Sequence, residues 1–415
     1  MNTGPASVRA VVGERWAAGG GAFGVYVHIP FCRRRCDYCA FATWSDRYEM
    51  WPRYVDACIA DAHRLARFAR GPATSVFFGG GTPSLLPADA LVGILEALRR
   101  SVGLALGAEV TVECNPETVS AAKLAAYRAG GVTRLSFGAQ SMVPHVLDAL
   151  GRQHDPASVV SAARLAAEAG FAGSYSVDLI FGAVGETMAD WRASLEGVLS
   201  LDPAPSHVSA YALTVEPGTP LAGEPARHPD DDDQADKYFL ADNVLSGAGL
   251  GWYEISNWAR PERRCAHNLL YWAQGEYLGL GCAAHSHLVF PDGSARRWWN
   301  VRTPERYCRL VQQDAGVEAL GETLSPRQRA AEALVLVLRT SAGVPTDVVP
   351  AELYECGLVA PGPGRQGARR AVLTVRGRLL ANEVAVRLHT VREVGRETGP
   401  PPGPVLFARE EAEVW

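Results

Sequence analysis

Three cysteines lie close together in one short stretch of the chain, at Cys32, Cys36 and Cys39. Soft thiolate ligands select zinc or an iron–sulfur cluster, so the number of ligands has to decide between the two. A structural zinc site is closed by four protein ligands. No fourth thiolate lies nearby, and the position two residues after Cys39 is Phe41. The spacing therefore predicts a [4Fe-4S] cluster held by three thiolates, with one iron open to a substrate.

Other groups suited to binding a ligand follow apolar, β-rich segments. The run Gly79-Gly80-Gly81-Thr82 comes directly after one such segment. Consecutive glycines let the backbone approach a ligand closely with its N–H and C=O groups exposed, although a tight turn is the alternative. Glu113, Gln140 and Asp178 fall at or just past the ends of three later segments. We expect all of these groups to meet at one face of the fold.

The segments that position these groups alternate between two kinds. The apolar, β-rich stretches are Val25–Ile29, Ser75–Phe78, Val110–Glu113, Arg134–Phe137, Ser174–Phe181 and His207–Leu213. The Ala- and Leu-rich stretches typical of helices include Tyr54–Phe68, Ala88–Ser101, Ala157–Ala169 and Met188–Leu201. Strands that are apolar on both faces and alternate with helices indicate a parallel sheet covered by helices. Six such units predict an α/β fold, a partial (β/α)6 barrel of the TIM type, with its chemistry at the carboxyl ends of the strands.

The cysteine motif, read with its flanking residues, resembles the radical S-adenosylmethionine (SAM) superfamily. The resemblance rests on the string Tyr26-Val27-His28-Ile29-Pro30-Phe31-Cys32, on the spacing of the cysteines and on Tyr38 before the last of them. Within the superfamily, the chain is similar to the oxygen-independent coproporphyrinogen III oxidases and their relatives, the HemW-type heme chaperones. The likeness is strong over residues 23–300 and looser over residues 325–388. It implies that SAM binds at the open iron.

The resemblance also implies a role for each residue of the cofactor pocket. Tyr26 and Tyr38 would contact the first SAM, with Tyr38 near the adenine, while Gly80 and its neighbours hold the methionine amino group. Glu113 would contact the ribose hydroxyls or the amine. In the oxidase branch, a second SAM is touched by the residues that match Gly81, Thr82, Gln140, Arg152, Asp178 and Ala212. Whether a second SAM binds to this chain stays open.

Two features bear on the choice between chaperone and oxidase. The oxidases carry a further cysteine where this chain has Phe41, and the string His267-Asn268-Leu269-Leu270-Tyr271-Trp272 resembles the HNxxYW marker of the chaperones. A histidine can ligate heme iron while aromatic rings pack on the macrocycle. A core histidine among aromatic residues is the alternative, and Cys265 is an alternative ligand.

The resemblance thus implies a protein that binds heme and transfers it to an acceptor protein. The alternatives are two radical enzymes. One is a coproporphyrinogen III oxidase, an oxidoreductase that forms protoporphyrinogen IX by oxidative decarboxylation. The other acts on an unrelated substrate, since function depends on the site and not on the fold.

Four regions are expected along the chain. They are a flexible N-terminus (1–20), a core with a porphyrin- or heme-associated extension (21–315, the extension from about 217), a winged-helix-like α+β domain (325–390) and an extended tail (391–415). In the third region, helices are expected at Arg327–Arg339 and near Val348–Cys356. A turn at Arg376-Gly377-Arg378 would then separate two strand-like or mixed segments, Ala371–Val375 and Glu383–Leu388.

Composition narrows the class of protein and its partners. The chain has 415 residues, 47% of them hydrophobic, and a net charge of −5, which is typical of a soluble globular protein and does not favour nucleic acid. No apolar run approaches the ~18 residues of a membrane span. We expect a cytoplasmic protein whose partners are heme or a porphyrin, a heme acceptor and an electron donor. A peripheral association with membranes and the oligomeric state stay open.

Overall fold

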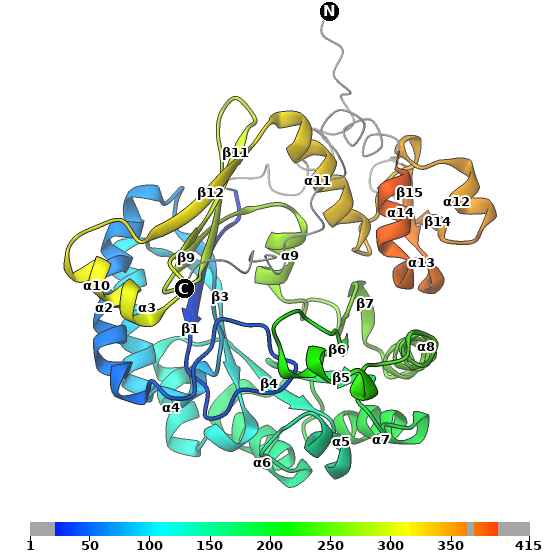
Figure 1. Ribbon diagram of the computed structural model, residues 1–415, viewed down its shortest axis with the longest axis horizontal. Helices are drawn as coiled ribbons and strands as arrows, with labels where there is room; N and C mark the ends of the chain where they lie inside the picture. Colours follow the sequence, from blue (N-terminus) through cyan, green and yellow to red (C-terminus); the bar gives the residue numbers. More distant parts are fainter. Residues whose placement is uncertain (1–20, 363–368, 389–415) are drawn as a thin grey trace, which may run out of the picture.

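The computed structural model describes residues 21–362 and 369–388. One large sheet, flanked by helices, makes up most of the protein, and a small module with its own three-stranded sheet lies beside it (Figure 1). The expected flexible N-terminus and extended tail lie outside the described residues. Within the described ranges, no helix is both long and apolar enough to cross a membrane.

Six parallel strands form the centre of the large sheet. They are β1 (Phe23–Ile29), β2 (Ala73–Gly80), β3 (Leu104–Cys114), β4 (Arg134–Gln140), β5 (Tyr175–Phe181) and β6 (His207–Ala212). Their order in the sheet follows their order in the sequence, and each neighbouring pair is parallel. This arrangement confirms the prediction of a partial (β/α)6 barrel, and all six expected β-rich segments are strands.

Helices alternate with these strands. They are α2 (Trp51–Leu65), α3 (Ala88–Ser101), α4 (Ala121–Gly130), α5 (Pro144–Ala149), α6 (Pro156–Ala166) and α7 (Met188–Leu199). Short helical turns are η1 (Tyr48–Met50), η2 (Ala66–Phe68), η3 (Pro83–Leu85), η4 (Pro116–Thr118) and η5 (Ala167–Phe171). Helix α6 begins where Asp155 accepts a hydrogen bond from the Ser158 amide at 2.8 Å and Pro156 occupies the first turn, a favourable helix start.

The two faces of the parallel strands differ, which corrects one expectation. The outer face is apolar as expected, and its buried residues include Val25, Val27, Val76, Phe78, Val110, Val112, Leu135 and Val177. The inner face is not apolar, because Glu113, Ser136 and Asp178 occupy it: Glu113 pairs in register with Ser136, and Asp178 pairs with Gly138. Asp178 lies in the middle of β5 and not at its end. The barrel interior is therefore a polar surface suited to a ligand.

The sheet continues beyond the six strands on both sides. Strand β9 (Glu276–Leu280) joins β1 in parallel, followed by antiparallel β10 (His285–Val289), β11 (Ala295–Asn300) and β12 (Glu318–Leu324). Antiparallel β8 (Asn257–Ala259) and β7 (Gly251–Glu254) extend the sheet from β6. The helices of this extension are η6 (Pro220–Gly223), η7 (Pro225–Arg227), α8 (Asp231–Gly247), α9 (Ala266–Trp272) and α10 (Pro304–Gln312). The sheet has two edges, at β12 and β7, so the barrel is open.

The C-terminal module has a separate hydrophobic core. It consists of α11 (Pro326–Leu338), β13 (Val344–Pro345), η8 (Thr346–Val348), α12 (Ala351–Glu355), β14 (Val359–Gly362), β15 (Arg370–Leu373), α13 (Val375–Leu379) and α14 (Ala381–Arg387). The prediction of a turn after Val375 is wrong, because Thr374 accepts a hydrogen bond from the Gly377 amide and starts α13 there. Strands β14 and β15 are antiparallel neighbours in the small sheet of this module.

Candidate iron–sulfur and cofactor site

The cysteine loop leaves β1 and is fastened back onto it before α2 begins. The Trp44 amide donates to the Pro30 carbonyl at 2.7 Å, and the Cys32 amide donates to the Trp44 carbonyl at 3.0 Å. The Nε2 atom of His28 lies 2.9 Å from the Ala42 carbonyl oxygen. His28 thus holds the far end of the loop, as a residue at the end of a strand can.

The sulfur atoms of Cys32, Cys36 and Cys39 are half-buried and in no disulfide. Burial first, and then the charges of Cys39 and Cys36, raise the pKa of the Cys32 thiol to about 11 against a hydrogen bond from Thr82. An Arg152 nitrogen lies 3.5 Å from Cys36 Sγ. Within the described ranges, no group of three His, Cys, Asp or Glu side chains is arranged to hold a single metal ion. A cubane cluster has several irons over which its thiolates are spread.

These three thiols fit a cluster chemically. They crowd one another closely enough to oppose each other's ionisation, and iron removes that opposition because it binds thiolates and displaces their protons. The Arg152 guanidinium beside Cys36 places a positive charge next to the loop that would hold the anionic cluster ligands. The loop can therefore hold the predicted cluster.

The glycine run fits tightly against the end of β1. The Gly81 amide donates to the Ile29 carbonyl and the Thr82 amide to the Phe31 carbonyl, each at 2.8 Å. Gly80 has a φ of +107°, and a Cβ atom there would lie 2.4 Å from Cε1 of His28. Glycine is thus required at position 80 because a side chain there would collide with His28. This steric reason was not expected from the sequence, which suggested close approach to a ligand.

Two half-buried carboxyl groups, Glu113 and Asp178, lie near each other on the inner surface. Burial first, and then the charge of Asp178, raise the pKa of Glu113 to about 8 against a hydrogen bond from the Gly80 amide, 3.2 Å from Oε2. Burial also raises the pKa of Asp178. Asp178 accepts hydrogen bonds from Ser136 at 2.9 Å and Ser209 at 2.7 Å. Glu113 is therefore protonated at neutral pH until a cationic group approaches it.

Arg152 connects the cluster loop to the ends of β3 and β4. Beside its contact with Cys36, it donates to Asn115 Oδ1 at 2.9 Å and to the Gly138 carbonyl at 3.1 Å. Gln140 ends β4 with a left-handed backbone φ of 64°. This conformation is uncommon for residues other than glycine and is found at functional sites. Its Nε2 atom would lie 2.8 Å from a Cβ at Gly138. Sequence reasoning missed Asn115, although it follows Glu113 by two residues.

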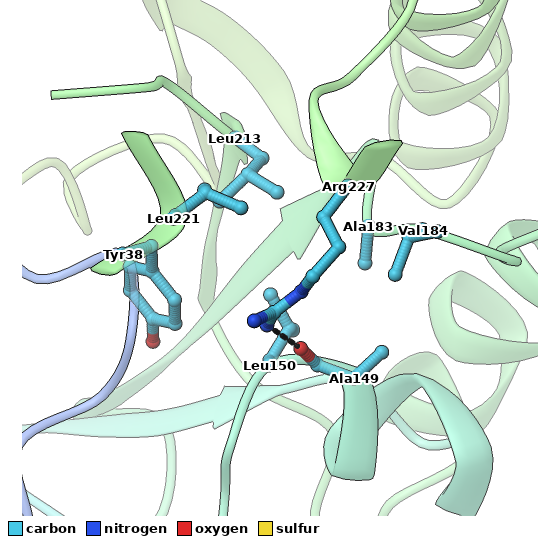
Figure 2. A pocket seen from close by; sticks show the side chains of 8 residues that line it. All are labelled: Tyr38, Ala149, Leu150, Ala183, Val184, Leu213, Leu221 and Arg227. Carbon is cyan, nitrogen blue, oxygen red and sulfur yellow. Dashed lines mark hydrogen bonds between the residues drawn. The ribbon is translucent and has the colours of Figure 1, made fainter. Parts of the chain in front are cut away.

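A segment far along the chain clasps the cluster loop. The guanidinium of Arg227 contacts the Asp37 carboxylate at 3.1 Å and donates to the Ala149 carbonyl at 2.9 Å. The Leu221 amide donates to the Asp37 carbonyl at 3.0 Å. Figure 2 shows Arg227 reaching toward Ala149, with Tyr38 and Leu221 lining the same pocket. Asp37 and Arg227 are 190 residues apart, so no local pattern could have linked them.

The remaining predicted cofactor residues lie at two places. The Tyr26 hydroxyl is 3.1 Å from Nδ1 of His28, and its ring stacks on Phe77. Thr82 donates to Cys32 Sγ at 3.7 Å. Ala212 ends β6 and is exposed, paired in register with Phe181. The structure thus brings Tyr26 and Thr82 to the cysteine loop and leaves Ala212 at the rim of the barrel.

Helix α9 carries the HNxxYW string against the same inner face. Glu109 caps the start of this helix by accepting hydrogen bonds from the amides of Ala266 and His267, each at 3.1 Å. Burial lowers the pKa of His267 to about 3, so its ring is neutral. Nδ1 lies 2.9 Å from the Ser75 hydroxyl, Nε2 lies 2.8 Å from the Tyr271 hydroxyl, and the ring stacks on Phe77.

Both ring nitrogens of His267 are therefore engaged in a buried network, the arrangement of a core histidine. Trp272 is buried, and Cys265 is buried with its thiol 3.5 Å from Glu109. Burial strongly raises the pKa of that thiol. Neither candidate heme ligand is exposed.

Comparisons with known proteins agree with this geometry. A family model described as the radical SAM superfamily matches residues 26–197. The chain is 40% identical to the heme chaperone HemW of Mycobacterium tuberculosis (strain H37Rv) over 376 residues, 88% of this chain and 94% of the relative. It is 35% identical to the heme chaperone HemW of Escherichia coli (strain K12) over 368 residues, 87% of this chain and 96% of the relative.

The fold is also similar to a solved structure, that of coproporphyrinogen III oxidase (HemN) from Escherichia coli. The TM-score is 0.74 over 92% of each chain, at 22% sequence identity, so this likeness concerns the fold alone. Identity at the level of the relatives, over nearly the whole chain, goes further. The chain belongs to the HemW family of the radical SAM superfamily.

Proposed function

We propose that this protein is a heme chaperone that carries a [4Fe-4S] cluster, binds SAM and heme, and transfers heme to an acceptor protein in the cytoplasm. The observation that carries the proposal is the similarity over nearly the full length to two proteins named heme chaperone HemW. Phe41 supports it, because the oxidases resemble a pattern with a cysteine at this position and this chain has phenylalanine. Phe41 lies at the end of the cluster loop and is 44% exposed.

The residues described above suggest how the cofactors are held. Cys32, Cys36 and Cys39 would ligate the cluster, which supplies an open iron for SAM and a centre for one-electron reduction. Glu113, once ionised, would stabilise the positive charge of SAM, and Gly80 keeps the end of β2 close to the cluster loop. Arg152 would place its positive charge beside the cluster ligand Cys36.

Heme is proposed to bind where α9 meets the inner face of the barrel. Tyr271 and Trp272 supply aromatic surface for an apolar macrocycle. His267 could ligate iron only after it releases Ser75 or Tyr271, because both of its nitrogens are engaged. Heme ligation by His267 therefore requires its ring to give up one of these hydrogen bonds, and the absorbance spectrum of the bound heme is expected to report that ligation.

Heme titration of the purified protein tests this proposal. We expect heme uptake with a defined absorbance spectrum. His267→Ala should alter the spectrum, and Trp272→Ala should weaken binding about tenfold or more, since a ring of this size buries a large apolar area. His63→Ala and Phe68→Ala, which remove exposed side chains from α2 and η2, are the controls. Wild-type affinity and spectrum in both α9 variants would contradict the placement of heme.

The second candidate function is that of the oxidase, because the fold is similar to that of coproporphyrinogen III oxidase. An anaerobic assay with coproporphyrinogen III, SAM and reductant separates the two. We expect no decarboxylation. Cluster-dependent formation of protoporphyrinogen IX would replace the chaperone proposal with the oxidase.

A further inference from the structure

Three consecutive arginines stand inside the cluster loop, between the first and second ligands. Arg33, Arg34 and Arg35 are all exposed, and the exposed ring of Phe41 follows the third ligand. We call these four residues the arginine patch. No role has been assigned to them in the site described above.

The positive charge of this patch is largely uncompensated. Neither Arg33 nor Arg34 has a hydrogen bond or ion pair with another residue in the described part of the chain. The two aspartates of the loop region are engaged elsewhere, Asp37 with Arg227 and Asp46 with Arg47. The chain as a whole has a net charge of −5, so the patch is a local positive area on an acidic protein.

More positive charge borders the patch. Arg33 lies close enough to Lys123, and Arg35 to Arg302, for each pair to repel. Such repulsion is unfavourable in the free protein, and a negatively charged partner would relieve it. The crowding of cations thus points to an anionic partner.

The patch is also connected directly to the cluster ligands. Arg35 donates to the carbonyl of Cys39 at 3.0 Å. Tyr48, whose side chain is 39% exposed, donates its hydroxyl hydrogen to the carbonyl of Cys32 at 2.9 Å. A partner bound to this surface would therefore contact Arg35 and Tyr48, which hydrogen-bond directly to the backbone of two of the three cysteine ligands.

We propose that the arginine patch is the docking surface for an acidic one-electron carrier protein. This inference rests on the proposed cluster. In the step it serves, the reduced carrier loses one electron and the cluster gains one, and no atom or bond is exchanged. Exposed arginines beside aromatic rings are a composition enriched at protein interfaces, and small, electrostatically steered contacts are typical of electron-transfer partners.

The test compares two double variants of the reconstituted full-length protein. Arg33→Glu with Arg34→Glu reverses the patch and leaves Arg35 on the Cys39 carbonyl. Arg260→Glu with Arg376→Glu makes the same change of charge at exposed arginines on the loop after β8 and on α13. The probe is a reduced plant-type [2Fe-2S] ferredoxin, and the anaerobic rate of cluster reduction is measured at low and high salt, with dithionite as a second reductant.

We expect the patch variant to be reduced by ferredoxin about tenfold or more slowly at low salt, with the difference shrinking at high salt. The control variant and the dithionite rates should match the wild type within about twofold. Arg33→Gln with Arg34→Gln provides a milder pair if charge reversal lowers the iron content.

Equal ferredoxin rates in the patch variant and the wild type would overturn the inference, and so would an equal loss in the control. Loss of heme uptake with an unchanged ferredoxin rate would also overturn it, and would assign the patch to heme propionates. A wild-type protein that assembles no iron would instead refute the proposed function.

Discussion

At the scale of single residues, the cysteines of the cluster loop differ from those of the hydrophobic core. Cys32, Cys36 and Cys39 are half-buried in the loop, whereas Cys58 on α2 and Cys308 on α10 are fully buried. Free cysteine in a core behaves as a small hydrophobic residue. The position of a cysteine, and not its type alone, decides whether it can hold iron.

Replacing any of the three loop cysteines by alanine should therefore abolish the cluster. Cys58→Ala and Cys308→Ala should keep about four irons and four sulfides per chain after anaerobic reconstitution, because three thiolates and an open site are the [4Fe-4S] arrangement. Iron and sulfide analysis measures both. A fully assembled cluster in Cys36→Ala would contradict the ligand assignment.

Glu113 gives a prediction about pH. Its pKa is raised to about 8 in the folded protein, so the folded state binds more protons than the unfolded state above the model-peptide value, and stability without ligand falls as pH rises toward 8. A cationic ligand reverses this, because it favours the carboxylate. SAM affinity of the reconstituted protein should therefore rise between pH 6.5 and 8.5.

The rise should approach about tenfold per pH unit below the pKa and flatten above it. Glu113→Gln should remove most of the slope, while Glu96→Gln on the exposed face of α3 should keep it. Equilibrium binding over this pH range provides the measurement. The same slope in wild type and Glu113→Gln would show that another group titrates.

At the scale of elements, the strands and helices of the barrel were predictable because each carries a local pattern. Expected strands coincide with β1 to β6, and the segment Ala88–Ser101 is α3 from end to end. Local pattern also led to two errors. The apolar composition of the strands hid the polar inner face, and the glycine in Arg376-Gly377-Arg378 suggested a turn where Thr374 caps α13.

In the candidate site too, some residues were predictable from local patterns of the sequence and others were not. The three cysteines, the glycine run and Glu113 are marked by spacing or by their place after a strand. Asp37 and Arg227 were not predictable, because their contact depends on how β6 and η7 return to the loop. The same holds for Ser136 and Ser209, whose hydrogen bonds to Asp178 depend on how strands β4, β5 and β6 pair.

The clasp of Asp37 and Arg227 should hold the cluster loop in place. Arg227→Ala should therefore release iron to a chelator about fivefold faster, since a partly exposed ion pair contributes up to ~1 kcal/mol. Asp37→Asn should have a similar effect, and the double variant should add little. Arg192→Ala, which removes an exposed ion pair on α7, is the control. Additive losses in the double variant would mean that the two residues act separately.

At the scale of the whole molecule, the C-terminal module is fixed to the barrel by a few definite contacts. The guanidinium of Arg378 on α13 lies 2.6 Å from Asp242 on α8 and 3.8 Å from the centre of the Trp252 ring. The Ser341 amide donates to the Tyr253 carbonyl at 2.9 Å. One side chain of the module thus joins an ion pair and a cation–π contact.

Arg378→Ala should loosen the module from the barrel. The free energy that holds the module to the barrel should fall by about 2–4 kcal/mol, because the ion pair is mostly buried and the change leaves Asp242 without its partner. Hydrogen exchange in residues 326–388 should become faster relative to the barrel strands. Arg376→Ala, an exposed arginine on the same helix, should leave exchange unchanged, and equal effects in the two variants would contradict this role.

The clasp on the cluster loop also has a consequence for biosynthesis. The cysteines leave the ribosome before Arg227, which fastens their loop through Asp37 and follows Asp37 by 190 residues in the chain. Glu305, which pairs with Arg47 at the other end of the loop, follows later still. The nascent chain therefore carries the three cysteine thiols well before Arg227 and Glu305, which fix the loop, have been synthesised. Stable loading of iron is expected only after the barrel and its extension have been synthesised.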